Sequence, residues 1–216
     1  MTPLRVTATL AGPIALAGGH LAIDALLAWA TATRDGLPPP AQASDCTPLE
    51  IPLEREPGGR FHLASLGIFD REQAAHRFVN RRFPIEEAQM MGASSLKRVL
   101  LSGGPTKSYR LPLATWWLVG DRIDWFAVGD RGAGADLLSW VGYLGKRRAV
   151  GVGRVQRWEV DECEPWGEGF PVVRDGRPLR PLPLDWPGLV EPRQALQCMT
   201  YPYWDHTREV ACAVPG

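Results

Sequence analysis

The sequence predicts an α+β fold whose core follows the order β-α-β-β-α-β. Stretches of alternating polarity open and close residues 1–162, and two helical patterns lie between them. The remaining residues, 163–216, contain nine of the twenty prolines of this 216-residue chain. We therefore expect a core over 1–162, with an insertion at about 70–110, and a Pro-rich extension over 163–216 that packs on the core or on a partner subunit.

The first half of the core is expected to contain a strand, a helix and a strand pair. Residues 4–12 (LRVTATLAG) are β-branched and end in Gly-Pro, which predicts the first strand. Residues 18–36 have the strongest helical pattern, and the following LPPP ends the helix. Residues 48–56 and 59–69 predict two strands joined by a Pro-Gly-Gly turn.

The insertion at about 70–110 is expected to consist of short elements and loops, and the second half of the core follows it. Residues 111–119 and 123–130 predict two strands with a Gly-Asp turn between them. Residues 134–145 predict a second helix, which should be well buried because its apolar residues cover more than one face. Residues 154–162 alternate in polarity and predict the final strand.

This element order is that of the ferredoxin-like, or RRM-like, arrangement, here with a basic insertion. Right-handed crossover connections would place both helices on one face of an antiparallel sheet. The opposite face is then expected to be available to a ligand or partner.

The chain has nine tryptophans, many for its length. Four of them lie in predicted elements and are expected in the core: Trp29, Trp125, Trp140 and Trp158. The pair Trp116-Trp117 puts one indole on each side of a strand, so one of the two is expected at the surface.

The charge is unevenly distributed although the net charge is zero. Residues 71–158 carry fifteen basic and seven acidic residues, whereas acidic residues outnumber basic ones on both sides. The overall pI near 6.9 argues against a free-standing nucleic-acid binder but is compatible with a subunit that has one basic face. Chance segregation on a solvated surface is the alternative.

The location of the protein is expected to be cytoplasmic. The four cysteines form no CxxC pair, which favours reduced thiols over disulfides or a zinc site. The sequence contains no run of eighteen apolar residues, so it predicts no membrane span, and no membrane contact is expected.

The stretch GKRRAVGVGRV, residues 145–155, combines three glycines and four basic residues with no acid. It lacks the third glycine of a dinucleotide motif, and GGPTKS at 103–108 lacks the last glycine of a phosphate loop. Glycines allow a ligand close to the main chain, and backbone N–H groups and cations together hold phosphates. Polyanion binding is therefore predicted here, against the alternative of a flexible solvated loop, for Lys146, Arg147, Arg148, Gly151, Gly153 and Arg154.

No catalytic, metal or cofactor site is predicted. The histidines lack metal-ligand spacing, and no nucleophile motif or acidic cluster is present. Asp24 is interpreted as a structural hydrogen-bond acceptor. His20, at the predicted helix start, is either a packing residue or, if the protein is a ribonuclease, a general acid or base.

The stretch DLLSWVGYLGKRRAVGVGRVQRWEV (136–160), together with the opening strand and GGHLAIDALLAWA, resembles the RAMP superfamily of CRISPR-associated proteins. The resemblance covers most of residues 1–160. Within the superfamily, IDWFAVGD, the helix end LGKRRAVGVGRV and the Pro-rich end together look most like the subunit of type IV effector complexes that caps the 5′ end of the CRISPR RNA. The glycine-rich loop of that group matches the six loop residues named above.

The resemblance implies a non-catalytic, RNA-binding subunit of an antiviral ribonucleoprotein complex. Such a subunit holds the 5′ handle of the CRISPR RNA and contacts the backbone RAMP subunit and the large subunit, with target DNA as a further candidate ligand within the complex. On charge alone, the insertion adds RNA-binding candidates: Arg77, Arg81, Arg82, Lys97, Arg98, Lys107 and Arg110. The alternatives are a metal-independent endoribonuclease that processes precursor CRISPR RNA, and a protein-interaction module without nucleic-acid contact.

Overall fold

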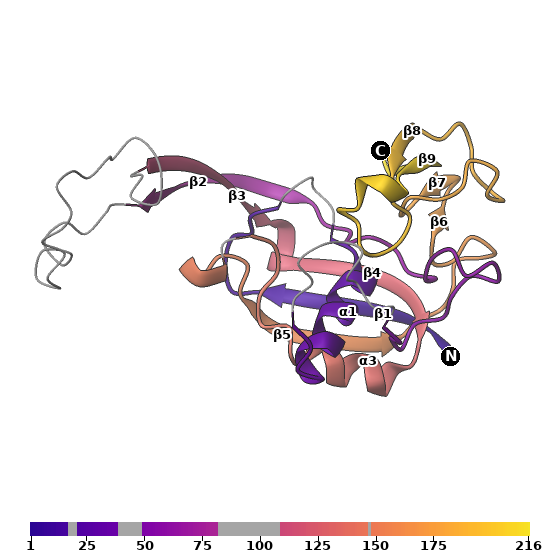
Figure 1. Ribbon diagram of the computed structural model, residues 1–216, viewed down its shortest axis with the longest axis horizontal. Coiled ribbons are helices and arrows are strands. Elements are labelled where there is room, and N and C mark those ends of the chain that lie inside the picture. Colours follow the sequence, from indigo (N-terminus) through magenta and orange to yellow (C-terminus); the bar gives the residue numbers. More distant parts are fainter. Residues whose placement is uncertain (17–20, 39–48, 82–108, 147) are drawn as a thin grey trace, which may run out of the picture.

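A computed structural model of the chain is shown in Figure 1 and describes residues 1–16, 21–38, 49–81, 109–146 and 148–216. These residues form a mixed α/β structure with two α-helices and four antiparallel sheets. No helix within these ranges is long and apolar enough to cross a membrane.

The central sheet has three strands in the order β4-β1-β5: β1 (Thr2–Leu10), β4 (Arg122–Gly129) and β5 (Val155–Glu162). Val6 of β1 lies opposite Trp125 on one side and Val160 on the other. Alternate residues of β1 and β4 are buried, as the period of two in their sequences requires. The predicted strands at 4–12, 123–130 and 154–162 are confirmed to within two residues or so at each end.

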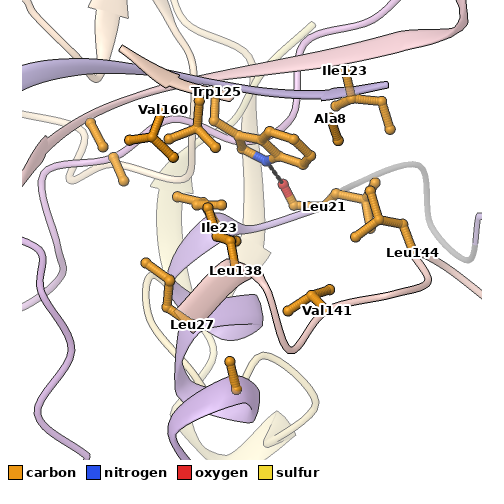
Figure 2. Close-up of a cluster of buried hydrophobic side chains, with 14 of the residues drawn as sticks. Ala8, Leu21, Ile23, Leu27, Ile123, Trp125, Leu138, Val141, Leu144 and Val160 are labelled. Carbon is orange, nitrogen blue, oxygen red and sulfur yellow. Dashed lines mark hydrogen bonds between the residues drawn. The ribbon is translucent and has the colours of Figure 1, made fainter. Parts of the chain in front are cut away.

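The two helices, α1 (Ile23–Arg34) and α3 (Arg131–Leu138), contact each other and pack on the buried side of this sheet. Figure 2 shows side chains of both helices beneath Trp125 of β4, whose indole Nε1 donates to the carbonyl oxygen of Leu21 at 2.9 Å. The indole N–H is thus paired although Trp125 is fully buried. The predicted core role of Trp125 is confirmed.

The second helix is shorter than the expected 134–145 and begins earlier. Asp130 caps it by accepting a hydrogen bond from the backbone N–H of Ala133 at 2.9 Å. Beyond Leu138, the chain becomes extended, and Tyr143 forms an antiparallel bridge with Arg154. Glycines at 142 and 145 weaken a helix here, and the bridge supplies the backbone hydrogen bonds instead.

The prediction of strands at 48–56 and 59–69 is wrong in detail. These residues form isolated antiparallel bridges beside β4, at Leu53–Gly129, Ala64–Ala127 and Ile68–Asp124. The carboxylate of Glu56 accepts hydrogen bonds from the backbone N–H groups of Gly58 and Arg60 at 2.7 and 2.9 Å. The hydrogen bonds of this turn take the place of continuous β-sheet pairing. Pro52 has no backbone N–H group to donate to a neighbouring strand.

A long hairpin projects from the core (Figure 1) and consists of β2 (Arg71–Arg81) and β3 (Tyr109–Leu118). The expectation of only short elements and loops at 70–110 is wrong for β2, which has eleven residues. β3 was expected at 111–119 but pairs with β2 instead of β4. Gly120 and Asp121, with φ of 65° and 52°, turn the chain from the hairpin into the central sheet.

The extension contains two further strand pairs, β6 (Val173–Arg174) with β7 (Arg177–Pro178), and β8 (Gln194–Gln197) with β9 (Val210–Ala213). It buries its own apolar cluster against Phe61. Trp166 and Phe170 pack on Phe126 of β4, with ring centroids 4.8 and 6.3 Å away.

The face of the sheet opposite the helices is therefore partly covered by the extension, contrary to the expectation of a free face. Its charges are also paired with one another. Arg5 binds Asp124 through two hydrogen bonds of 3.2 and 3.0 Å, and Arg157 lies 3.1 Å from Glu159. A polyanion would have to break these pairs to bind there.

Candidate nucleic-acid interface

The glycine-rich loop is closed at its base by two backbone hydrogen bonds. The N–H of Leu144 donates to the carbonyl of Gly153 at 2.7 Å, and the N–H of Val155 donates to Gly142 at 2.9 Å. These bonds continue the pairing between the segment after α3 and the start of β5. The loop thus leaves the core and returns to it at one fixed place.

A second set of bonds attaches the loop to the segment that follows β1. The N–H of Lys146 donates to Ala15 at 2.8 Å, and the N–H of Gly153 donates to Pro13 at 2.9 Å. Ile14, between these two acceptors, is fully buried. Residues 13–15 therefore hold both ends of the loop.

Two of the loop glycines are required by packing. Gly145 and Gly153 have φ of 74° and 72°, and a Cβ atom at either would lie 2.3 or 2.0 Å from a backbone carbonyl oxygen. Gly151 also has a positive φ, of 77°. It differs in its surroundings, because nothing lies within 4 Å of the position that a Cβ atom would take. The bare backbone at Gly151 faces open space, where a ligand can approach it.

The side chains of the loop present positive charge to solvent. Lys146, Arg148 and Arg154 are exposed, and none of them forms an ion pair with the residues that the structure describes. Arg148 begins a short 3-10 turn, Arg148–Val150, and its guanidinium lies 5.3 Å from the ring centroid of Trp29. Arg147 lies outside the described residues. The basic character of the loop is thus available to a partner.

Exposed aromatic rings accompany this loop. Trp29 of α1 is 39% exposed, Trp140 is 51% exposed and Tyr143, bridged to Arg154, is 37% exposed. The prediction that Trp29 and Trp140 belong to the core is therefore wrong. A helical wheel carries the missed signal for Trp29, since it lies off the buried stripe of α1 formed by Ile23, Leu27 and Ala30.

The base of the β2–β3 hairpin meets the same anchoring segment. Ile14 and Trp116 of β3 exchange two backbone hydrogen bonds of 2.9 and 2.8 Å. Residues 13–15 consequently join the glycine-rich loop to the hairpin. The indole of Trp117 is 38% exposed, as expected for one of the Trp116-Trp117 pair, while Trp116 is half-buried beneath the guanidinium of Arg71, 4.9 Å from its ring centroid.

The structure places only part of the predicted insertion residues. Arg77 and Arg81 lie in β2 and Arg110 lies in β3, where Arg81 pairs with Tyr109 and Arg110 with Asn80. The other basic candidates fall outside the described residues: Arg82, Lys97, Arg98 and Lys107. The hairpin therefore carries three of the predicted positions out from the base that it shares with the loop.

A second charged group lies away from the loop and is enclosed. Asp24 of α1 is 2% exposed and accepts hydrogen bonds from the hydroxyl of Tyr203 at 2.8 and 2.9 Å, with Arg180 at 3.5 Å. Burial opposes ionisation of Asp24, but the charge of Arg180 and the hydrogen bonds outweigh it and lower the pKa. The interpretation of Asp24 as a structural acceptor is confirmed.

Arg180 completes this group. Its guanidinium is buried and donates to the backbone carbonyls of His62, Ala64 and Met199. Sequence reasoning missed Arg180 and Tyr203, because no short spacing links them to Asp24. The two terminal nitrogen atoms of this buried guanidinium have acceptors in residues 62–64 and 199 and in Asp24, so Arg180 is a structural element that ties the extension to α1.

The described residues offer no arrangement for metal binding, since no three His, Cys, Asp or Glu side chains gather among them as ligands would. His20 lies outside the described residues. Cys163, Cys198 and Cys212 are free thiols, and burial raises their pKa values.

A family model matches the chain over residues 87–215, and its description is CRISPR type IV associated protein Csf3. The matched span is more than half of the chain and includes the whole glycine-rich loop. It also includes the extension, of which only the Pro-rich character contributed to the sequence resemblance. The match confirms the resemblance to a type IV CRISPR-associated subunit. No curated protein matches the chain.

Proposed function

Because the chain belongs to the family of CRISPR type IV associated protein Csf3, we propose that it is a non-catalytic subunit that holds CRISPR RNA in a ribonucleoprotein complex. The glycine-rich loop is the observation that carries this proposal. It is fixed at its base by four backbone hydrogen bonds and presents Lys146, Arg148 and Arg154 without carboxylate partners among the described residues. Such a fixed, basic, glycine-containing loop suits an RNA backbone.

The contacts of the loop would divide into two kinds. The cations would bind phosphate oxygens, and the open backbone at Gly151 would let the chain of the RNA approach closely. Trp29, held beside Arg148, and Tyr143 offer exposed rings on which unpaired bases can stack. The β2–β3 hairpin, joined to the loop through residues 13–15, would extend the RNA-binding surface.

The bound RNA segment is proposed to be the 5′ handle, with the backbone and large subunits as neighbours in the complex. The acidic extension supports protein contacts on the side away from RNA. Leu196 is 66% exposed there and Trp204 is 49% exposed. Exposed apolar side chains of this size are common in protein interfaces.

We also infer that the core is ferredoxin-like. The strand order β4-β1-β5 with all neighbours antiparallel corresponds to three strands of that fold. The bridges at Leu53, Ala64 and Ile68 lie beside β4, where the remaining strand of the fold would pair. In this interpretation, residues 49–69 are an irregular edge strand.

The proposal is tested on the complex purified with its RNA. We would replace Lys146, Arg148 and Arg154 by Gln and compare this variant with the triple variant Arg122→Gln, Arg131→Gln and Arg157→Gln. The control removes the same charge from exposed arginines that already have carboxylate partners at 3.2, 3.5 and 3.1 Å. The loop variant should retain less RNA and show a salt dependence of binding weaker by about 2 in the log–log slope, at about 0.7 per lost phosphate contact.

Equal RNA content and equal salt slopes in the two variants would exclude the loop as the RNA site. Catalysis is checked separately, by incubating the wild type with repeat RNA in the presence of a chelator. Cleavage that His20→Ala abolishes would replace the non-catalytic proposal with the ribonuclease alternative.

A further inference from the structure

A pocket of about 270 Å³ is lined by Asp24 and Ala28 of α1, by residues within 49–62 and by residues within 200–208. Its polar lining includes Asp24, Arg55, Arg60, His62 and Arg208. Pockets for drug-sized ligands measure about 300–1,000 Å³. This pocket is therefore of a size for a small group.

The charge at the pocket is positive once its internal pairs are counted. Arg60 is neutralised by Glu56 at 2.9 Å, and Asp24 is neutralised by Arg180. Among the described residues, the guanidinium groups of Arg55 and Arg208 donate to backbone carbonyls, of Gly59 and Tyr201, both at 3.4 Å, and neither forms an ion pair there. Two guanidinium groups from distant parts of the chain thus keep their charge beside one cavity.

The wall of the pocket includes His62, which lies beside Asp24. The side chain of His62 is 9% exposed, and its Nδ1 atom has no hydrogen-bond partner among the described residues. The carboxylate of Asp24 is 3.9 Å from Nδ1, which is beyond hydrogen-bond reach. Nδ1 is itself enclosed, so His62 contributes to the wall of the pocket, and the unpaired positive charge comes from Arg55 and Arg208.

We propose that this pocket binds a phosphate group. Arg55 and Arg208 grip its oxygen atoms from two sides. Forked guanidinium donors match the oxygens of phosphate, and charge-assisted hydrogen bonds are the strong ones in proteins. The site is separate from the glycine-rich loop and does not depend on the function proposed for that loop.

The phosphate can belong to a small molecule or to the end of an RNA chain, and both share the same recognition chemistry. The test uses the full chain and its thermal unfolding midpoint, followed by tryptophan fluorescence. Inorganic phosphate should raise the midpoint in a saturable manner, while sodium chloride at matched ionic strength should not.

The variants Arg55→Gln and Arg208→Gln should each weaken phosphate binding about tenfold, the loss expected for a hydrogen bond to a charged group. Both residues are exposed, so the variants should fold as the wild type does. Arg157→Gln removes the same charge from β5, far from the pocket lining, and should bind phosphate as the wild type does.

The source of the phosphate is distinguished by two further probes, adenosine monophosphate and a short oligoribonucleotide with or without a 5′-phosphate. An advantage of the 5′-phosphorylated oligonucleotide that disappears in the Arg55→Gln, Arg208→Gln double variant assigns the site to an RNA end. The same behaviour for adenosine monophosphate alone assigns it to a nucleotide. The Lys146, Arg148 and Arg154 loop variant should keep its response to inorganic phosphate.

The proposal is overturned if phosphate gives no saturable shift in the wild type. It is equally overturned if Arg157→Gln loses as much binding as the pocket variants, since the effect would then be one of net charge. If the loop variant and the control variant retained RNA equally while the phosphate response stayed intact, only the function proposed for the loop would fail, and the phosphate pocket would stand.

Discussion

The glycine-rich loop and the Asp24–Arg180 cluster both concentrate charged side chains, but only the cluster neutralises them within the fold. Asp24, Arg180 and Tyr203 are enclosed and hydrogen-bonded to one another. Lys146, Arg148 and Arg154 point into solvent from a backbone that is itself well fixed. The cluster serves the stability of the chain, whereas the loop keeps its charge for a partner.

Removal of a charge is therefore expected to have different effects in the cluster and in the loop. Removing a charge from the cluster should lower the stability of the chain, but the folded fraction of the variant should still bind RNA. Removing a charge from the loop should change RNA binding and leave stability intact.

The largest effect is expected for Asp24→Asn, which leaves Arg180 buried without its countercharge. The loss should be about 3–5 kcal/mol in the free energy of unfolding, measured in urea near pH 7. Asp35→Asn, in an exposed pair with Arg34, should show no comparable loss. A double variant with Arg180→Met should lose less than the sum of its two single variants.

The pH dependence of the same variant has a definite sign. The pKa of Asp24 is lower in the folded chain than in the unfolded one, so its contribution is present above the unfolded pKa and is lost as the pH falls through the folded pKa. The difference between wild type and Asp24→Asn should therefore narrow in acid. A constant difference from pH 7 to pH 2 would contradict the ionised state of Asp24.

Gly153→Ala should have the next largest effect, about 3 kcal/mol. The added methyl group meets the carbonyl of Leu144 at 2.0 Å, and the left-handed backbone adds about 1–2 kcal/mol of strain. Urea unfolding measures the loss. A variant as stable as the wild type would show that the base of the loop can shift freely.

Glu56→Gln should cost about 1–2 kcal/mol at pH 7. The guanidinium of Arg60 and the backbone N–H groups of Arg60 and Gly58 together hold the pKa of Glu56 at about 2. The contribution is present above about pH 4.5 and disappears as the pH falls through 2. Unfolding curves of both proteins across this range should therefore converge in acid.

Gly151→Ala should have the smallest effect on stability, about 1 kcal/mol, because it meets only backbone strain and no neighbouring atom. RNA retention should nevertheless fall clearly, since the methyl group occupies the open side of the backbone. If Gly151→Ala retained RNA fully, the close approach proposed at this glycine would be wrong.

The sequence was sufficient to predict the central sheet and the long helix, where hydrophobic periodicity is strong. β1, β4 and β5 lie where the alternation in polarity predicted them. It failed at residues 49–69, where the turn at Glu56 breaks the expected strands into bridges. It also failed at the partner of β3, because strand pairing is decided by tertiary contacts that no local pattern encodes.

The candidate site divides in the same way. The basic glycine-rich loop was visible as a local pattern, but the different roles of Gly151 and Gly153 depend on the carbonyl of Leu144 that only folding brings close. The exposure of Trp29 was predictable from its place on the helix, whereas that of Trp140 depends on α3 ending at Leu138. The phosphate pocket joins residues 24, 55 and 208, a combination that no spacing indicates.

The bonds of Asp24 also bear on how the chain is made. Its partners Arg180 and Tyr203 follow it by 156 and 179 residues. The carboxylate of Asp24 in α1 therefore stays without these two partners until both of them have been synthesised. A nascent chain stalled before residue 180 should remain sensitive to protease in α1, and release of the full chain should bring protection.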